Sequence, residues 1–361
     1  MIAPMLSLLT GFPGFIGTRL SRKLLADDPS LEIVALVEPA MADRAREVAK
    51  EFGGRLTVVE GDITDPKLGL DGKTYVELAG KVRRVYHLAA IYNLAVPESL
   101  ARKVNVDGTQ HVLDFCRACT DLERHHYIST CYVAGKRTGK VLESELDEGQ
   151  EFKNHYESTK FAAEVLVKAS QDEIPTTIYR PGIVVGDSRT GDTQKFDGPY
   201  FILWFIYRMR QLGLTVGDMG TANATFNAVP VDFIVDAIAA CTQDPETAGA
   251  TLALADPNPL TTRQFVSLLS RTYVHRDPWG PAIPDFVMKP FLAVKPIRSF
   301  YGSTPFESLV FLKHPVQYDT TQATKHLARN GLKCPGFNDY VDVMVDFFDQ
   351  HKGEKAFKVA A

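Results

Sequence analysis

The stretch MLSLLTGFPGFIGTRLSRKLLAD, residues 5–27, decides the fold of this chain. Its first six residues form an apolar run typical of a buried strand, and a glycine-rich loop follows at residues 11–17. From Phe15 onward the apolar side chains recur at helical spacing. Strand, glycine loop and helix in this order indicate the opening of a βαβ unit, in which the helix packs back onto the strand.

Each glycine of the loop has its own role in such a unit. Gly11 can take the tight turn, Gly14 lets the backbone approach a pyrophosphate, and Gly17 lets the helix pack closely on the strand. The first turn of the helix offers free N–H groups and a positive dipole end to phosphates. A plain glycine turn is the alternative, but the strand–loop–helix context favours a dinucleotide site. The predicted cofactor contacts in this loop are Gly11, Phe12, Gly14, Phe15, Ile16 and Gly17.

Strand-like and helix-like segments alternate along the first half of the chain. Continuous apolar strands of this kind predict a parallel sheet that is buried on both faces. After Gly186 the sequence becomes polar and turn-rich, and later it mixes helical segments with prolines and aromatic residues. The predicted fold is α/β: a Rossmann-type doubly wound parallel sheet from residues 1–186 and 229–256, with a smaller, discontinuous, mainly helical substrate-binding cap from residues 187–228 and 257–361. The predicted strands cover residues 5–10, 31–37, 55–62, 83–90, 125–130, 176–182 and 250–256, and the predicted helices cover 15–27, 41–51, 97–118, 153–170, 199–213 and 229–241.

Composition and charge narrow the class of protein. The chain has 361 residues and a formal net charge of −4, and no basic run is dense enough to predict nucleic-acid binding. No apolar stretch reaches the roughly 18 residues of a transmembrane helix, and the N-terminus lacks the features of a secretory signal. Five scattered cysteines indicate a reducing compartment, so we expect a cytoplasmic protein. Cys116 and Cys119 form a CxxC, which we interpret as two buried side chains on one helix face; no metal site is predicted.

Two acidic residues follow the second and third predicted strands. Glu38 ends the second strand about 20 residues after Gly17, where a carboxylate can accept hydrogen bonds from both ribose hydroxyls of NAD and repel the 2′-phosphate of NADP. Arg44 and Arg46 are close enough in sequence to leave NADP possible. Asp62 follows the third strand and can meet the adenine edge, although a turn-forming Asp is an equal alternative.

A tyrosine and a lysine stand at the spacing that proton chemistry requires. Tyr156 and Lys160 are four residues apart, so both lie on one face of a helix. A nearby ammonium favours the phenolate and lowers the phenol pKa from about 10, which makes the tyrosine a usable general acid or base. Thr130 ends an earlier strand, where its hydroxyl can orient a carbonyl at the carboxyl edge of the sheet. The predicted catalytic residues are therefore Thr130, Tyr156 and Lys160.

Several segments match one superfamily in order and spacing. They are TGFPGFIG (10–17), YHLAA (86–90), VNVDGT (104–109), STCYVAG (129–135), YESTK (156–160) and RPGIVVG (180–186). Over about residues 5–260 the chain resembles the extended short-chain dehydrogenases/reductases. Within that superfamily, residues 88–97 and 129–167 are similar to the thioester-reductase and fatty-acyl-reductase branch.

The resemblance implies roles for individual residues. Thr130 would be the hydroxyl partner of the substrate oxygen, Tyr156 the proton donor, and Lys160 the group that binds the nicotinamide ribose and tunes Tyr156. Ala89 and Ala90 would lie beside the cofactor. Further predicted cofactor contacts are Asp62, Ile63, Asn105, Tyr156, Lys160, Pro181, Gly182, Ile183 and Val184, the last four flanking the nicotinamide.

The resemblance also bears on the cofactor and the assembly. Members of the acyl-reductase branch often have an arginine after the second strand to hold the NADP phosphate, and Glu38 stands at that place here. The residue therefore favours NAD(H), whereas the resemblance favours NADP(H). A homodimer through the helices near residues 98–118 and 153–170 is implied as well.

The aromatic side chains of the predicted cap suggest an apolar substrate. An apolar tunnel for a long chain or ring is one interpretation; the cap's own core, or a helix at residues 199–212 that contacts a membrane surface through Arg208 and Arg210, are alternatives. These apolar residues are Tyr200, Phe201, Trp204, Phe205, Tyr207, Phe286, Val287, Met288, Phe291, Leu292, Phe300, Tyr301, Leu309, Val310, Phe311 and Leu312.

These observations predict an NAD(P)-dependent oxidoreductase. It would transfer a hydride between the nicotinamide and the carbonyl of an apolar aldehyde, ketone or acyl thioester, with the tyrosine as proton donor. An NAD-dependent epimerase, dehydratase or dehydrogenase of a nucleotide-sugar or steroid-like alcohol is a second hypothesis, although a sugar-nucleotide enzyme needs more polar groups in the cap. A non-catalytic cofactor sensor is a third. His125, His126 and His155 are interpreted as structural, because they lack metal-ligand spacing.

Overall fold

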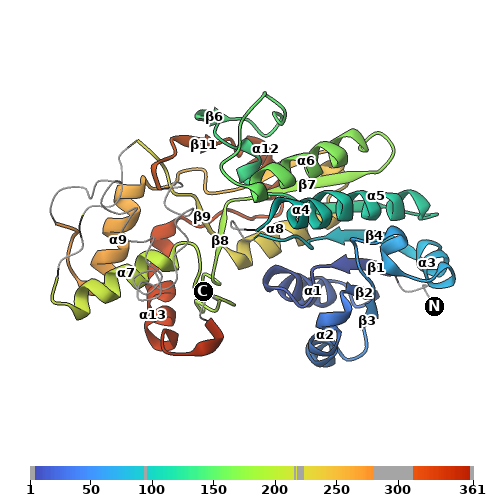
Figure 1. Cartoon of the computed structure of the whole chain (residues 1–361), viewed down its shortest axis with the longest axis horizontal. Coiled ribbons are helices and arrows are strands. Elements are labelled where there is room, and N and C mark those ends of the chain that lie inside the picture. Colours follow the sequence, from blue (N-terminus) through green and yellow to red (C-terminus); the bar gives the residue numbers. More distant parts are fainter. Residues whose placement is uncertain (1–4, 93–95, 215–216, 218–222, 280–311, 358–361) are drawn as a thin grey trace.

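The computed structural model describes residues 5–92, 96–214, 217, 223–279 and 312–357 of the chain. Within these residues, seven strands form one sheet in the order β10-β7-β5-β4-β1-β2-β3, and every neighbouring pair is parallel (Figure 1). The predicted Rossmann-type sheet is therefore confirmed. Its strands are β1 (Met5–Thr10), β2 (Leu31–Val37), β3 (Leu56–Glu60), β4 (Val82–His87), β5 (Arg124–Ile128), β7 (Thr176–Pro181) and β10 (Thr251–Leu254).

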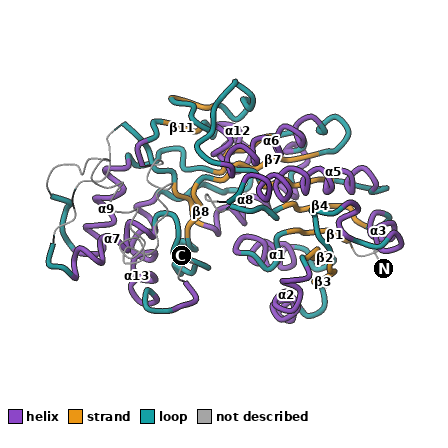
Figure 2. The backbone as a smooth tube through the Cα atoms, in the orientation of Figure 1, coloured by secondary structure: helices purple, strands orange, loops and turns teal. Residues whose placement is uncertain are grey.

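Helices cover both faces of the sheet (Figure 2), and each face has its own core. Successive residues of a strand point to opposite faces, so Leu8 packs into one core and Leu9 into the other. On the first face lie α3 (Gly72–Ala79), α5 (Gly108–Ala118) and α6 (His155–Ala169); on the second lie α1 (Phe15–Asp27), α2 (Ala42–Ala49), α8 (Val231–Gln243) and α12 (Thr321–Ala328).

The order of winding reverses between β1 and β4. The chain runs from β1 outward to β2 and β3, and then returns across the sheet to β4 on the other side of β1. The connections after β1 and β4 therefore leave in opposite directions. In doubly wound sheets such a reversal opens a crevice at the carboxyl ends of the two strands, and ligands bind there.

A second cluster of helices stands beside the sheet, at the left of Figure 1. It consists of α7 (Tyr200–Gln211), α9 (Thr262–Val274) and α13 (Val341–His351), which share a third core. Tyr200 and Trp204 of α7 are buried in that core, and the Trp204 ring meets the Phe348 ring edge-on at 5.3 Å. For these residues the structure favours the interpretation as the cluster's own core over a tunnel lining. The aromatic and apolar residues predicted between 286 and 311 lie outside the described residues.

Two local predictions need correction, and one pair of strands was missed. The helix predicted from residue 229 begins at Val231, because Ala228–Pro230 form strand β9 beside β8 (Ile183–Val185). Cys119 follows the last turn of α5 with an extended backbone, so it does not share a helix face with Cys116. Short strands β6 (Gly139–Val141) and β11 (Val316–Tyr318) pair with each other and were not predicted.

The helix predicted over residues 97–118 is interrupted in its hydrogen-bond pattern. It runs as α4 (Glu98–Arg102), a π-helical turn (Lys103–Asp107) and then α5. Such π-turns occur mostly as single turns inside α-helices and often mark functional sites. Among the described residues, no helix is both long enough and apolar enough to cross a membrane.

A buried ion pair fixes α6 against β7. Glu164 accepts hydrogen bonds from Nε and Nη2 of Arg180 at 2.9 and 2.6 Å, and the side chains are 0 % and 4 % exposed. Glu164 also accepts a hydrogen bond from the Ser129 hydroxyl, and Arg180 donates to the carbonyl of Glu145 at 2.8 Å. These contacts hold the end of β5 and the middle of α6 in one register.

We expect Glu164→Gln to lower the free energy of unfolding by about 3–5 kcal/mol, because it leaves the Arg180 guanidinium buried without its carboxylate. The matched control is Glu51→Gln, which breaks the exposed Arg22–Glu51 pair and is expected to cost less than about 1 kcal/mol. Urea denaturation followed by circular dichroism measures both values. Equal losses in the two variants would contradict the distinction between the pairs.

Candidate active site

The glycine loop has the close packing that a phosphate cradle requires. Gly11 has φ +88°, and a Cβ there would lie 2.9 Å from the backbone nitrogen of Ala89. A Cβ on Gly14 or on Gly17 would lie 2.7 or 2.5 Å from the Gly11 carbonyl oxygen. Gly14 is the N-cap of α1 and supplies no side-chain cap to its first turn. The loop therefore fits a pyrophosphate. Its oxygens can approach the backbone closely and accept hydrogen bonds from the N–H groups in the first turn of α1.

The floor of the crevice is tied together by Thr10, which sequence reasoning missed. Its hydroxyl accepts hydrogen bonds from the backbone nitrogens of Leu88 and Ala89 at 3.2 and 3.1 Å, and it contacts His87 Nδ1 at 2.8 Å. Burial lowers the pKa of His87 well below its usual value, so the imidazole is neutral. Thr10 therefore joins the end of β1 to the chain that follows β4.

Asn105 holds the next part of this chain. Its side-chain amide forms two hydrogen bonds with the backbone of Ile91, at 2.8 and 3.1 Å, and donates to the Thr159 hydroxyl at 3.0 Å. Asn105 lies in the π-helical turn, and Thr159 directly precedes Lys160 on α6. The predicted cofactor contact therefore positions the loop that carries Ala89 and Ala90 against the helix that carries Tyr156.

Thr130 and Tyr156 come together at the carboxyl edge of the sheet. Thr130 follows β5 and is buried, whereas Tyr156 lies in the first turn of α6, which Asn154 caps by accepting from the Glu157 nitrogen at 2.9 Å. The Thr130 hydroxyl lies near enough to the Tyr156 hydroxyl to act on its pKa. Burial raises the pKa of Tyr156 to about 12, and the influence of Thr130 only partly offsets this rise.

Lys160 is buried on the same helix but contacts other groups. Its Nζ donates to the Tyr127 hydroxyl at 2.9 Å and to the Ile128 carbonyl at 2.8 Å. Burial lowers the pKa of Lys160 to about 7, with Glu164 acting in the opposite direction. The expectation that Lys160 lowers the pKa of Tyr156 is wrong for this arrangement, since desolvation dominates the phenol.

Residues predicted for the adenosine half lie at the ends of β2 and β3. Glu38 directly follows β2 and is exposed beside the crevice edge. Arg46 pairs with Glu60 and with Asp43. Asp62 accepts from the Thr64 nitrogen at 2.8 Å, which matches the turn-forming alternative.

Ile63 packs underneath this edge. It is buried, and a Cβ on Gly108 of α5 would lie 2.9 Å from the Ile63 Cδ1. Its side chain therefore points toward α5, and this direction gives no support to the predicted cofactor contact.

The residues predicted to flank the nicotinamide continue from β7 into β8. A Cβ on Gly182 would lie 2.8 Å from the Asn227 carbonyl, so this glycine allows the two backbones to approach. Ile183 and Val184 are partly exposed. Asn227, His314 and Tyr318 line a small cavity next to Gly182 and Ile183, and sequence reasoning missed all three.

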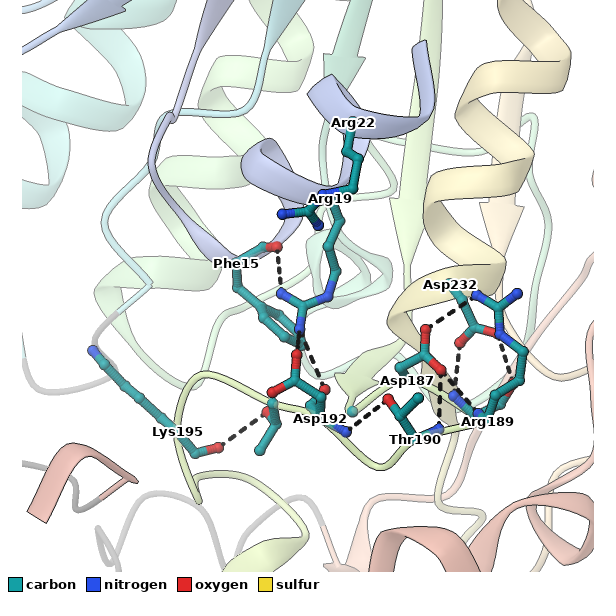
Figure 3. A network of polar contacts seen from close by, with 12 residues as sticks. Phe15, Arg19, Arg22, Asp187, Arg189, Thr190, Asp192, Lys195 and Asp232 are labelled. Carbon is teal, nitrogen blue, oxygen red and sulfur yellow. Dashed lines mark hydrogen bonds and ion pairs between the residues drawn. The ribbon is translucent and has the colours of Figure 1, made fainter. Parts of the chain in front are cut away.

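A polar network ties α1 to residues 187–198, the segment that follows β8 (Figure 3). Arg19 lies over the Phe15 ring at 4.3 Å and forms an ion pair with Asp192. Further along the segment, Lys195 donates to the Tyr92 hydroxyl at 3.3 Å. The segment is therefore attached on both sides of the crevice, to the helix after β1 and to the loop after β4.

Comparison with known proteins defines the class and then the family. A match to a family model, similar reductases and the parallel sheet identify the class of this chain. It is an NAD(P)-dependent enzyme of the extended short-chain dehydrogenase/reductase type, in its thioester-reductase-like branch. A family model described as "Male sterility protein" matches residues 9–238, and the chain belongs to this family.

Individual relatives are similar over most of the chain. The terminal R domain from the myxalamid PKS-NRPS biosynthetic pathway has a TM-score of 0.82 and 26% identity, covering 98% of this chain and 93% of that one. The L-2-aminoadipate reductase large subunit of Penicillium chrysogenum is 29% identical over 77% of this chain and 22% of its own length. Aldehyde reductase lnaA of Aspergillus flavus is 30% identical over 63% of this chain and 23% of its own length. The chain thus spans about a quarter or less of these two curated relatives.

The buried ammonium of Lys160 makes stability depend on pH. Its pKa is near 10.5 when exposed and about 7 in the folded chain, so between these values the unfolded chain binds more protons. The free energy of unfolding therefore rises with pH in this window, by at most about 1.4 kcal/mol per pH unit, and falls as the pH drops towards 7.

We expect Lys160→Met to remove this contribution to the slope, as measured by urea denaturation between about pH 7 and pH 10. The exposed Lys81 gives the control Lys81→Met, which should keep the wild-type slope. A wild-type slope in Lys160→Met would show that the ammonium is not desolvated.

Proposed function

We propose that this enzyme uses a reduced nicotinamide cofactor to reduce the carbonyl of an apolar aldehyde, ketone or acyl thioester. The observation that carries the proposal is the pair of neighbouring Thr130 and Tyr156 hydroxyls at the carboxyl edge of the sheet. It stands near the reversal of winding, where the glycine loop fits a dinucleotide. The reductase names of two curated relatives support the direction of the reaction.

The side chains divide the chemistry between them. The bound nicotinamide supplies the hydride. Thr130 and Tyr156 donate hydrogen bonds to the carbonyl oxygen and stabilise the negative charge that develops there. Because the pKa of Tyr156 is about 12, the phenol holds its proton at neutral pH and can donate it to that oxygen. With a thioester, the hemithioacetal then loses the thiol and yields an aldehyde.

Lys160 has a separate role in this proposal. Its Nζ donates to the carbonyl of Ile128, the last residue of β5, two residues before Thr130. The family resemblance assigns Lys160 to the ribose of the nicotinamide. Because burial disfavours the charged ammonium, groups that accept hydrogen bonds from Nζ stabilise it, and the ribose hydroxyls can do so.

The choice of cofactor follows from the end of β2. We propose that Glu38 accepts hydrogen bonds from the adenosine ribose and that the enzyme prefers NAD(H). Arg46 is paired with Glu60, which reduces its value as a partner for a 2′-phosphate. Arg44 remains exposed on α2 and is the basic group that would oppose this preference.

The division into parts is also a proposal. Residues 1–186 and 229–256 would form the dinucleotide-binding part, and residues 187–228 and 257–361 the substrate-binding cap. The separate core shared by α7, α9 and α13 supports it. The homodimer and the cytoplasmic location stay predictions.

We expect Tyr156→Phe to lower kcat by a factor of at least about 10², because the reduction loses its proton donor. NADH binding, followed by fluorescence titration, should change little. The control Tyr75→Phe removes a phenol on α3, away from the crevice, and should leave kcat unchanged. Wild-type turnover in Tyr156→Phe would remove this residue from the mechanism.

We expect Glu38→Ala to weaken NADH binding relative to NADPH by about tenfold, since a charge-assisted hydrogen bond and a repulsion are both lost. The control is Glu32→Ala, which removes an exposed carboxylate on β2, the strand that Glu38 follows. Titration of each variant with both cofactors gives the two ratios. If the ratio is the same in Glu38→Ala and in the wild type, Glu38 is not a ribose ligand.

A further inference from the structure

A cavity of about 20 Å³ adjoins the predicted reaction centre. It is lined by residues that include Tyr132, Gly182, Ile183, His314 and Tyr318. The backbone nitrogen of Tyr132 donates to the Thr130 hydroxyl at 3.2 Å, and the charge of Tyr156 influences Tyr132. The cavity therefore lies between the predicted catalytic hydroxyls, the residues predicted to flank the nicotinamide, and the segment that leads into β11.

His314 is one of the residues that line this cavity. Its Nε2 is buried and has no hydrogen-bond partner among the described residues. Buried polar atoms in native proteins nearly always have a partner, so this exception leaves room for one from outside the described residues. Asn227, which also lines the cavity, uses its amide to bind the backbone of Asp256 at 2.9 and 2.8 Å.

The state of the imidazole defines what that partner must be. Burial lowers the pKa of His314, so the ring is neutral at pH 7 and carries one N–H. The Arg137 backbone partly offsets this lowering of the pKa, as a carbonyl that accepts from the ring does. Because Nε2 has no partner among the described residues, we assign the ring N–H to Nδ1, facing that carbonyl. Nε2 therefore keeps its lone pair and acts as an acceptor.

We propose that His314 is a substrate-binding residue whose Nε2 accepts a hydrogen bond from an N–H or O–H group near the reacting carbonyl. The inference rests on the proposed function and refines it: the substrate is apolar apart from one donor at this position. A few placed polar groups among apolar and aromatic side chains are the usual means by which such a pocket fixes orientation. The donor can belong to the acyl group or to the arm that carries a thioester.

Two pairs of probes separate these sources. The first pair is the octanoyl thioester of pantetheine, which has an amide N–H, and the octanoyl thioester of ethanethiol, which has none. The second pair is 3-hydroxyoctanal and octanal. We expect the wild-type enzyme to prefer the donor-bearing member of one pair by about tenfold in kcat/KM, the value of one hydrogen bond.

The variants test whether His314 provides that preference. His314→Leu should abolish it through a higher KM for the donor-bearing probe, with kcat/KM for the other member within about twofold of wild type. His314→Gln retains an acceptor and should restore part of it. Three outcomes would overturn the inference: the preference persists in His314→Leu, kcat/KM falls equally on all four probes, or the wild type shows no preference. The last outcome would mean that Nε2 binds only water.

Failure of the proposed function has a different signature. If the wild-type enzyme reduces none of the four probes, the reductase proposal is wrong for these carbonyls. The inference is then decided by binding of the probes to the NADH complex, measured by quenching of the cofactor fluorescence. Tighter binding of one donor-bearing probe that His314→Leu removes would support it, and equal binding in both proteins would overturn it.

Discussion

The molecule is organised around one topological constraint, the reversal of winding between β1 and β4. The chain segments that follow these two strands leave in opposite directions. They therefore leave a crevice at the carboxyl ends of β1 and β4. The hydroxyl of Thr10 closes the base of the opening by binding the backbone after β4. The link adds to the pairing of β1 with β4 in holding the glycine loop against the Ala89 backbone, which lies too close for a Cβ on Gly11.

Desolvation then sets the proton chemistry of the site. Burial raises the pKa of Tyr156 to about 12 and lowers that of Lys160 to about 7, so it favours the neutral form of each group. A tyrosine that keeps its proton suits a donor in a reduction. The protonation of a lysine with such a low pKa depends strongly on the hydroxyls around it. The two shifts have one cause, and the interactions with Thr130 and Glu164 only reduce them.

Much of this arrangement could be predicted from local sequence. The strands, the glycine loop and the positions of Thr130, Tyr156 and Lys160 follow from apolar runs and short spacings, which depend on neighbours along the chain. The partners of these residues could not be predicted. His314 is separated from Gly182 by more than a hundred residues, and only folding brings them to one cavity. The direction of the Tyr156 shift depended on burial, which no spacing reveals. The CxxC spacing predicted one helix face for both cysteines, but Cys119 is the residue at which the backbone of α5 becomes extended.

The two sides of the crevice are held by interactions of different strength. Behind Lys160, the Glu164–Arg180 pair is almost fully buried, and breaking it would leave an unpaired charge in the core. In front, the Arg19–Asp192 pair is 20% and 54% exposed, and water can replace each partner at little cost. The contact of Asp192 with α1 therefore contributes much less to stability than the Glu164–Arg180 pair. Residues 187–198 are held instead by buried contacts of their own: Phe196 packs into the core shared by α7, α9 and α13, and Ser188 binds Asp232.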